Sequence, residues 1–304
     1  EDLNEFKPSE VMEQEGDFTY TKTESSFDRT VEPAFGEDPL VTPPAIWTAK
    51  TGNGIDVYGI ESNELPLVQF SFRIMGGLYL DNPEKVGAAN LITDLMMEGT
   101  ANKTPEELED AIGQLGSSIN MGTSNEYITI SGNCLARNYE ATMDLVSEIL
   151  LEPRWDAKEF ERIKSGTINT IQQREANPNS VASTVRSKLF YGEDHILSNP
   201  IIGYTETVEQ IALDDVKAFY EKNFSPSVTN YHVAGAVSKT AALKALEKLN
   251  SWEAKEVIIP EFDVPPVPTE PQVFFVDIPK AKQSVINIGR LAVAGDDPAY
   301  NLIS

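Results

Sequence analysis

The stretch FRIMGGLYLDNPEKVGAANLITDLMMEGT, residues 72–100, decides the fold. Its first residues end an apolar run, LVQFSFRIM at 67–75, whose β-branched and aromatic side chains are typical of a strand. A glycine pair and an Asp-Asn-Pro triplet then break the pattern. From Val86 to Glu98 the apolar residues recur at helical spacing, and a glycine follows. The stretch therefore predicts a strand, a glycine turn and a helix in immediate succession.

The flanking sequence predicts further strands and helices. Thr104 as N-cap, Pro105 at the first helical position and Glu107 three residues after the cap predict a helix up to about residue 115. Residues 55–60 predict a strand, joined to 67–75 by the polar turn SNELP, so a sheet begins here. The other predicted strands are 118–121, 127–135 and 228–236, and the other predicted helices are 138–152, 156–176, 179–191, 214–223 and 239–249.

Composition excludes several classes of function. The chain carries 48 acidic and 24 basic residues, a formal charge of -24, which makes a nucleic-acid backbone or an anionic membrane surface an unsuitable partner. It contains no run of about 18 apolar residues, so we expect no membrane span. Its single cysteine, Cys134, lies in an alternating stretch and is expected to be a buried, inert thiol.

Charge and proline content predict the domain organisation. Residues 1–44 read as an acidic leader or interdomain linker, since residues 1–40 hold twelve acids and three bases. One domain is predicted over 45–258. Five prolines between 260 and 271 predict a stiff linker over 259–271, and residues 272–304 then read as the incomplete start of a second domain, with opening strands and a helix.

Several parts of the sequence resemble the insulinase/pitrilysin peptidases, which include the mitochondrial processing peptidases and their inactive partner subunits. The resemblance covers about 45–252 and resumes at 272. It rests on the frame Gly76-Gly77, Leu80-Asp81, Gly87-Ala88-Ala89 and Gly99-Thr100, on LG.S.N..TS at 115–124, and on D....Y...FSPS....HVAGAVS at 215–238. It implies an α+β fold: a two-layer sandwich of a mixed, largely antiparallel sheet covered by helices, plus the start of a second similar domain.

The metal motif of that family is degenerate in this chain. Active members carry His-x-x-Glu-His on a helix, which places two imidazoles one turn apart on a zinc ion and a glutamate beside the bound water. The matching positions here are Asn90, Thr93 and Asp94, and the family's third ligand, a glutamate on a later helix, falls on Thr170. Glu175 remains as a nearby acid. The resemblance therefore implies no catalytic residue, no metal and no cofactor in this chain, with zinc expected only in a catalytic partner half.

Other chemistries remain weaker alternatives. Asn90 and Asp94, at i and i+4, offer two oxygens to a hard cation, fewer than the six to eight that calcium takes, so a hydrogen-bonded polar helix face is preferred. The two histidines, His195 and His232, are predicted on different elements. We interpret His195 as a surface or capping residue and His232 as a hydrogen-bonded sheet residue.

The resemblance implies a role for the module. Members of the family close an active and an inactive half over an unfolded peptide, so this chain is expected to be a non-catalytic part of a peptide-binding chamber opposite a catalytic half. The alternatives are a structural or assembly subunit without a peptide role and, less favoured, an active metallopeptidase. The acidic leader and the motif that follows it resemble the joint before the second half of a two-half chain, so we expect a part of a longer protein.

The same resemblance implies a peptide site and a compartment. The strand at 118–123 corresponds to an edge strand that accepts substrate through main-chain hydrogen bonds in active halves, so Ser118, Asn120 and Thr123 are expected to border the cavity, or else only to shape a turn. The net charge favours basic over acidic peptides. Paired or two-half bacterial members are commonly exported, so the periplasm or cell envelope of a bacterium is the expected location.

Overall fold

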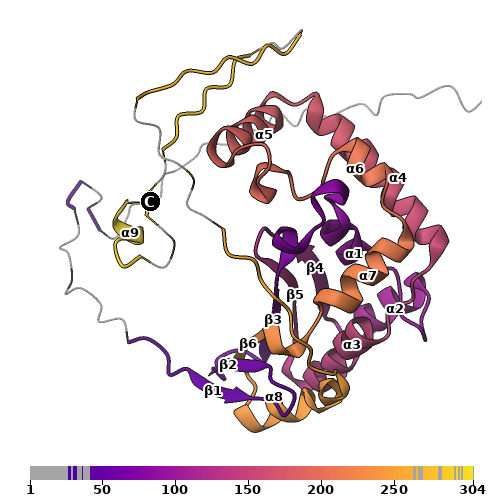
Figure 1. Ribbon diagram of the computed structural model, residues 1–304. Helices are drawn as coiled ribbons and strands as arrows, with labels where there is room; N and C mark the ends of the chain where they lie inside the picture. Colours follow the sequence, from indigo (N-terminus) through magenta and orange to yellow (C-terminus); the bar gives the residue numbers. More distant parts are fainter. Residues whose placement is uncertain are drawn as a thin grey trace, which may run out of the picture. The chain divides into compact units, whose positions relative to one another are not determined.

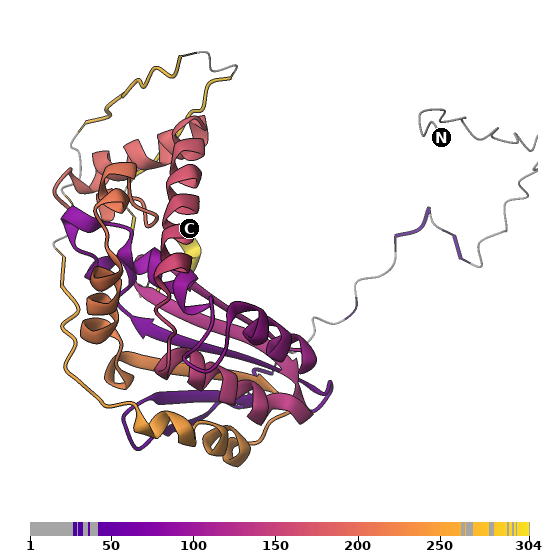
Figure 2. The same cartoon turned by 90° about the vertical axis from the view of Figure 1, so that its right-hand side faces the viewer.

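The computed structural model describes residues 27–28, 30–32, 36, 42–262, 265, 270–279, 283–290, 292–293, 295 and 297–303. The chain divides into two compact units, Glu1–Pro43 and Pro44–Ser304. In the first, the backbone N–H and hydroxyl of Thr30 both donate to the Asp28 carboxylate. Most of the predicted acidic leader lies outside the described residues. The second unit carries every helix and strand discussed below (Figures 1 and 2).

The described part of the second unit contains one mixed sheet of six strands. The strands are β1 Trp47–Lys50, β2 Asp56–Glu61, β3 Leu67–Met75, β4 Ser118–Thr123, β5 Tyr127–Leu135 and β6 Thr229–Gly235. Their order is β1-β2-β6-β3-β5-β4. Only β2 and β6 run parallel; all other neighbours are antiparallel. The predicted α+β fold with a mixed, largely antiparallel sheet is confirmed.

Helices cover the sheet (Figure 1). They are α1 Ala88–Met96, α2 Pro105–Gln114, α3 Tyr139–Leu151, α4 Ala157–Glu175, α5 Pro178–Tyr191, α6 Thr205–Glu209, α7 Leu213–Asn223, α8 Lys239–Ala245 and α9 Tyr300–Ile303. Residues of β3 alternate in burial: Val68, Phe70, Phe72 and Ile74 enter a core shared with α1, α3 and α7, whereas Gln69, Arg73 and Met75 are exposed. The period-2 pattern of the strand thus selects the covered face.

The first two predicted strands are consecutive in the sequence and lie in one sheet, but they are not neighbours in it. The turn after β2 does lead to β3, but β6 lies between them, parallel to β2 and antiparallel to β3. Local alternation identifies a strand without identifying its neighbour, because pairing depends on residues far along the chain. β1 and α6, four and five residues long, were not predicted from the sequence. The helix predicted at 239–249 ends earlier than expected, since α8 ends at Ala245 and a 3-10 turn continues to Ser251.

The residues after the proline-rich segment form a helix but no strand where the structure describes them. α9 agrees with the predicted helix. The described parts of 272–290 pair with no strand, and Val273, Phe275 and Ile288 are each at least 90% exposed. A strand requires a hydrogen-bonded neighbour, and none of the described residues supplies one. The domain limits at 258 and 271 stay predictions. No helix among the described residues is long and apolar enough to cross a membrane.

Candidate functional site

Helix α1 carries the positions of the metal motif, and the turn before it fixes its first residues. Gly87 has φ 115°, and a Cβ there would lie 2.9 Å from the Ile202 carbonyl oxygen, so only glycine fits. The carboxylate of Asp81 accepts hydrogen bonds from the N–H groups of Gly87 and Ala89, both at 2.9 Å. Burial raises the pKa of Asp81 to about 7, although both hydrogen bonds oppose that rise.

The polar side chains at the metal-motif positions of α1 form hydrogen bonds within the helix. Asn90 Nδ2 donates to Asp94 Oδ2 at 3.4 Å, and the hydroxyl of Thr93 donates to the Asn90 carbonyl at 2.8 Å. Thr93 is buried, Asn90 is half-buried and Asp94 is exposed. The surrounding protein nevertheless raises the pKa of Asp94 through desolvation, and Glu98 raises it further. These contacts agree with the expected hydrogen-bonded polar helix face.

The fourth motif position lies on α4, which packs against α1. Thr170 is exposed, and its hydroxyl donates to the Gly166 carbonyl one turn earlier at 3.0 Å. Glu175 is the last residue of α4 and is exposed as well. Helix packing thus brings the two motif-bearing helices together, as the resemblance requires.

The side chains at these positions do not fit a zinc ion. Zinc sites in proteins are built from imidazole, thiolate and carboxylate ligands held at about 2 Å. Here the set consists of an amide, two hydroxyls and one carboxylate, and both hydroxyls donate to backbone carbonyls of their own helices. Among the residues that the structure describes, no group of three or more His, Cys, Asp or Glu side chains could hold a metal.

Neither of the two histidines occupies a position of the metal motif. His195 caps a short 3-10 turn, its Nδ1 accepting from the N–H of Leu197 at 3.0 Å, so the predicted capping role is confirmed. His232 lies on β6 and stacks on Tyr58 with ring centroids 5.3 Å apart. Its Nδ1 has no hydrogen-bond partner among the described residues, so the prediction of a hydrogen-bonded ring is wrong at that atom. Desolvation and then Arg73 lower its pKa.

Strand β4, with the three predicted peptide-contacting residues, forms one edge of the sheet. It pairs with β5 on one side, from Ser118 opposite Asn133 to Thr123 opposite Ile128, and with no described strand on the other. Asn120 is exposed, and Ser118 and Thr123 are half-buried. The hydroxyl of Thr123 donates to the Ala89 carbonyl at 2.5 Å, which ties the end of β4 to the first turn of α1. The predicted edge strand is confirmed; peptide binding by it stays a prediction.

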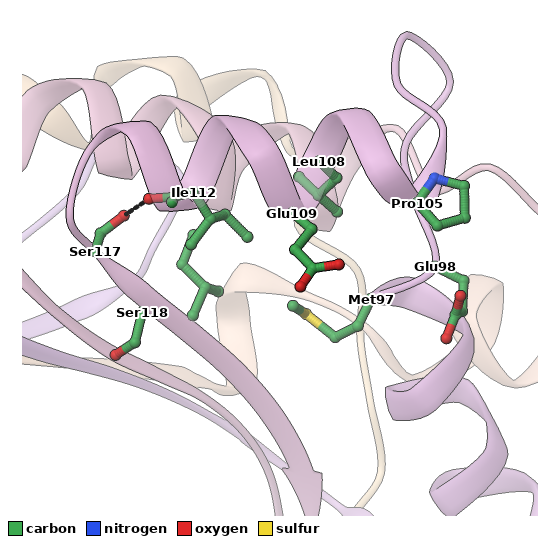
Figure 3. A pocket seen from close by; sticks show the side chains of 10 residues that line it. Met97, Glu98, Pro105, Leu108, Glu109, Ile112, Ser117 and Ser118 are labelled. Carbon is green, nitrogen blue, oxygen red and sulfur yellow. Dashed lines mark hydrogen bonds between the residues drawn. The ribbon is translucent and has the colours of Figure 1, made fainter. Parts of the chain in front are cut away.

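A groove of about 450 Å³ opens beside the first residues of β4 (Figure 3). Leu108 and Ile112 of α2 face it, together with Met97 at the end of α1. The hydroxyl of Ser117 donates to the Ile112 carbonyl at 3.0 Å and closes the corner between α2 and β4. Sequence reasoning missed this groove. The i, i+4 spacing of Leu108 and Ile112 was visible, but it equally describes a helix face buried in the core.

Comparison with protein families gives two adjoining matches. The profile of the insulinase family, peptidase family M16, matches residues 60–204. The profile of the peptidase M16 inactive domain matches residues 210–304. The three groups of motifs that carry the resemblance, at 76–100, 115–124 and 215–238, lie within these ranges.

Curated relatives carry related names at low identity. The chain is 26% identical over 176 residues to the uncharacterized zinc protease YmxG of Bacillus subtilis, covering 58% of this chain and 42% of that protein. It is 25% identical over 187 residues to the non-peptidase homolog YmxG of Helicobacter pylori, covering 61% and 43%. It is 24% identical over 176 residues to the mitochondrial-processing peptidase subunit beta of Caenorhabditis elegans, covering 58% and 38%. The matches thus span less than half the length of these relatives.

Solved structures share the fold. A peptidase M16 inactive domain from Pseudomonas fluorescens superposes with a TM-score of 0.69 at 23% identity, covering 73% of this chain and 54% of that one. The periplasmic protease PqqL from Escherichia coli superposes with a TM-score of 0.65 at 17% identity, covering 74% and 26%. These structures show the shared fold, and the two profile matches, which together cover most of the chain, show the family: this chain belongs to the insulinase family of peptidases, peptidase family M16.

Proposed function

We propose that the chain is a non-catalytic module of an insulinase-type metallopeptidase that forms part of a peptide-binding chamber opposite a catalytic half. One observation carries the proposal. The helix that bears the metal motif in active members is fully built and packed here, yet Asn90, Thr93 and Asp94 replace its functional side chains and bond to one another or to their own backbone. Zinc and the water it activates would then belong to the partner half alone.

The peptide role is supported by the edge of the sheet. β4 has no neighbour on its outer side among the described residues, and such an edge accepts an extended peptide through main-chain hydrogen bonds. The groove at Ser118 and Ile119 offers space for an apolar side chain of that peptide. In this proposal Ser118, Asn120 and Thr123 border the bound peptide. The name of the Helicobacter pylori relative, a non-peptidase homolog, agrees with a silent module.

Compartment and partner follow from the same reasoning. PqqL, which shares this fold, is described as a periplasmic protease, and we propose the periplasm or cell envelope of a bacterium for this chain also. The partner is a histidine-bearing half, on the same polypeptide or on another, and the substrate is an unfolded peptide.

The first test measures metal and cleavage together. The chain is purified and its zinc content is measured. Peptide cleavage is then assayed with the chain alone, with a candidate catalytic half alone, and with both. We expect no stoichiometric zinc and no cleavage from the chain alone, and at least tenfold faster cleavage from the pair than from the catalytic half alone. Zinc at one equivalent with unaided turnover would refute the proposal.

A second test separates a peptide role from a purely structural one. Two versions of one binding peptide carry N-methyl groups at alternate positions, odd in one and even in the other. A peptide added to β4 turns only alternate N–H groups toward the strand, so one version should lose at least tenfold in affinity and the other should bind like the parent. Equal binding of both versions, or no peptide binding at all, would favour the structural or assembly subunit.

A further inference from the structure

A second and larger pocket lies beyond the end of β4. It has a volume of about 880 Å³ and is lined by the end of α4, by α5 and by the loop at 199–204. Asn125, in the turn that directly follows β4, also lines it. The pocket is therefore adjacent to the point where an extended peptide on the edge strand would pass Thr123.

Arginine side chains give this pocket a local excess of positive charge. Arg174 in the last turn of α4 and Arg186 in α5 both line the pocket and are exposed. Neither forms an ion pair within the described residues. Arg162, on the preceding turns of α4, by contrast contacts both Glu98 and Glu159 at 2.6 Å. In a chain with twice as many acids as bases, the lining of this pocket has three arginines and one acid, Glu175, and this local excess of positive charge suits an anionic ligand.

Hydroxyl groups in the lining of this pocket can also donate hydrogen bonds to such a ligand. Ser180, Ser183, Thr184 and Ser187 contribute hydroxyl groups from α5. Arg290, from the segment after the proline-rich stretch, adds a third guanidinium, and Glu175 adds a carboxylate of opposite effect. Guanidinium groups bind carboxylates through two parallel N–H bonds, which gives both affinity and orientation.

We propose that this pocket binds carboxylate groups of a peptide whose extended part lies along β4. The inference rests on the proposed peptide role and adds a charge preference to it: although the chain as a whole is acidic, the peptide segment that passes Thr123 carries acidic residues or ends in a free carboxylate. The expectation that net charge alone selects basic peptides then fails at this end of the strand, because a ligand within a few ångströms responds to the local groups.

The test compares fluorescent peptides that share one neutral extended core. At either end the core carries an Asp-Glu pair or an Asn-Gln pair, and the C-terminus is free or amidated, so that side-chain and terminal carboxylates are distinguished. Affinities are measured by anisotropy at 50 and 300 mM salt, for the parent chain, for Arg174→Gln, Arg186→Gln and the double variant, and for Arg137→Gln as control. Arg137 is an exposed arginine without an ion-pair partner among the described residues and lines neither pocket.

We expect one placement of carboxylates to tighten binding about five- to tenfold at low salt, with a smaller gain at high salt. The double variant should lose that gain while binding the neutral peptide as before, and Arg137→Gln should keep it. If the neutral peptide binds but carboxylates bring no gain, or if the gain survives in the double variant, the pocket proposal is wrong and the peptide role stands. If no peptide binds, both proposals fail.

Discussion

The two faces of helix α1 differ in their contacts: one face packs in the core, and the other carries polar side chains. Its inner face, formed by Ala88, Ala89, Leu91, Ile92, Leu95 and Met96, is buried in the core, and Asp81 holds its first N–H groups. Its outer face carries Asn90 and Asp94, whose side chains hydrogen-bond to each other. The inner face holds the helix in position through core contacts that do not involve Asn90 or Asp94. The packing of α1 therefore does not depend on these two side chains.

The largest effect is expected when the metal-ligand residues of active members are restored on α1 and α4. The variant Asn90→His, Thr93→Glu, Asp94→His with Thr170→Glu restores the ligand types of active members on helices that already pack together. We expect it to bind about one equivalent of zinc and to gain several degrees in Tm on adding zinc, because metal binds only the folded state. The measurements are metal content after dialysis and calorimetric melting with and without zinc.

The parent chain and the variant without Thr170→Glu serve as controls. The parent should show no zinc-dependent change in Tm, and the three-substitution variant should bind zinc more weakly, since one ligand is missing. Without zinc the full variant should be less stable than the parent, because position 93 is buried and receives a carboxylate. A folded variant that ignores zinc would show that α4 does not present position 170 to α1.

Sequence alone predicted most of the scaffold, and the reason lies in local signals. The cap of α2 is an example: Thr104 accepts from the Glu107 N–H, and the Glu107 carboxylate accepts in return, as the Thr-Pro-x-Glu pattern predicted. Asp156 caps α4 in a similar way. Such contacts join residues two or three positions apart, so they can be predicted without a structure.

Contacts between residues far apart in the chain could not be predicted from the sequence. The insertion of β6 between β2 and β3 joins residues about 170 positions apart, such as Val57 and Tyr231, and no local pattern encodes it. The basic pocket was missed for the same reason: Arg174 and Arg186 are ordinary helix residues until α4 and α5 fold against each other and the turn at Asn125 approaches them. The absence of a histidine motif, by contrast, could be read directly from the sequence.

A second prediction compares the two faces of α1 by their effect on stability. Leu91 is fully buried, whereas its neighbour Asn90 is half-buried on the outer face. Leu91→Ala should lower the free energy of unfolding by about 2–5 kcal/mol through lost burial and a residual cavity. Asn90→Ala should change it by less than about 0.5 kcal/mol, since alanine favours the helix and only a long hydrogen bond is lost. Urea unfolding monitored by circular dichroism gives both values. Similar losses at the two positions would end the distinction between the faces.

The smallest expected effect concerns Asp81, whose carboxylate accepts the hydrogen bonds at the start of α1. Burial raises the pKa of Asp81 to about 7, above about 4 in the unfolded chain. The folded state then binds more protons than the unfolded state between these values, so the contribution of Asp81 to stability is full below about pH 4 and is lost as the pH rises through about 7. The positive end of α1 favours the carboxylate and reduces the shift, so we expect a loss of about 2 kcal/mol. Asp81→Asn, which does not titrate, removes this pH dependence.

The measurement is the difference in unfolding free energy between the parent chain and Asp81→Asn from pH 4 to pH 8. If the parent chain is the more stable and this difference shrinks with rising pH, desolvation determines the pKa of Asp81. The contact of Asp81 that anchors the start of α1 then stabilises the fold less as the pH approaches neutrality. A parent advantage that grows means that the two N–H donors of Gly87 and Ala89 prevail and hold an ionised carboxylate. In that second case the anchor is strongest near neutral pH, and the predicted direction of the pKa shift is wrong.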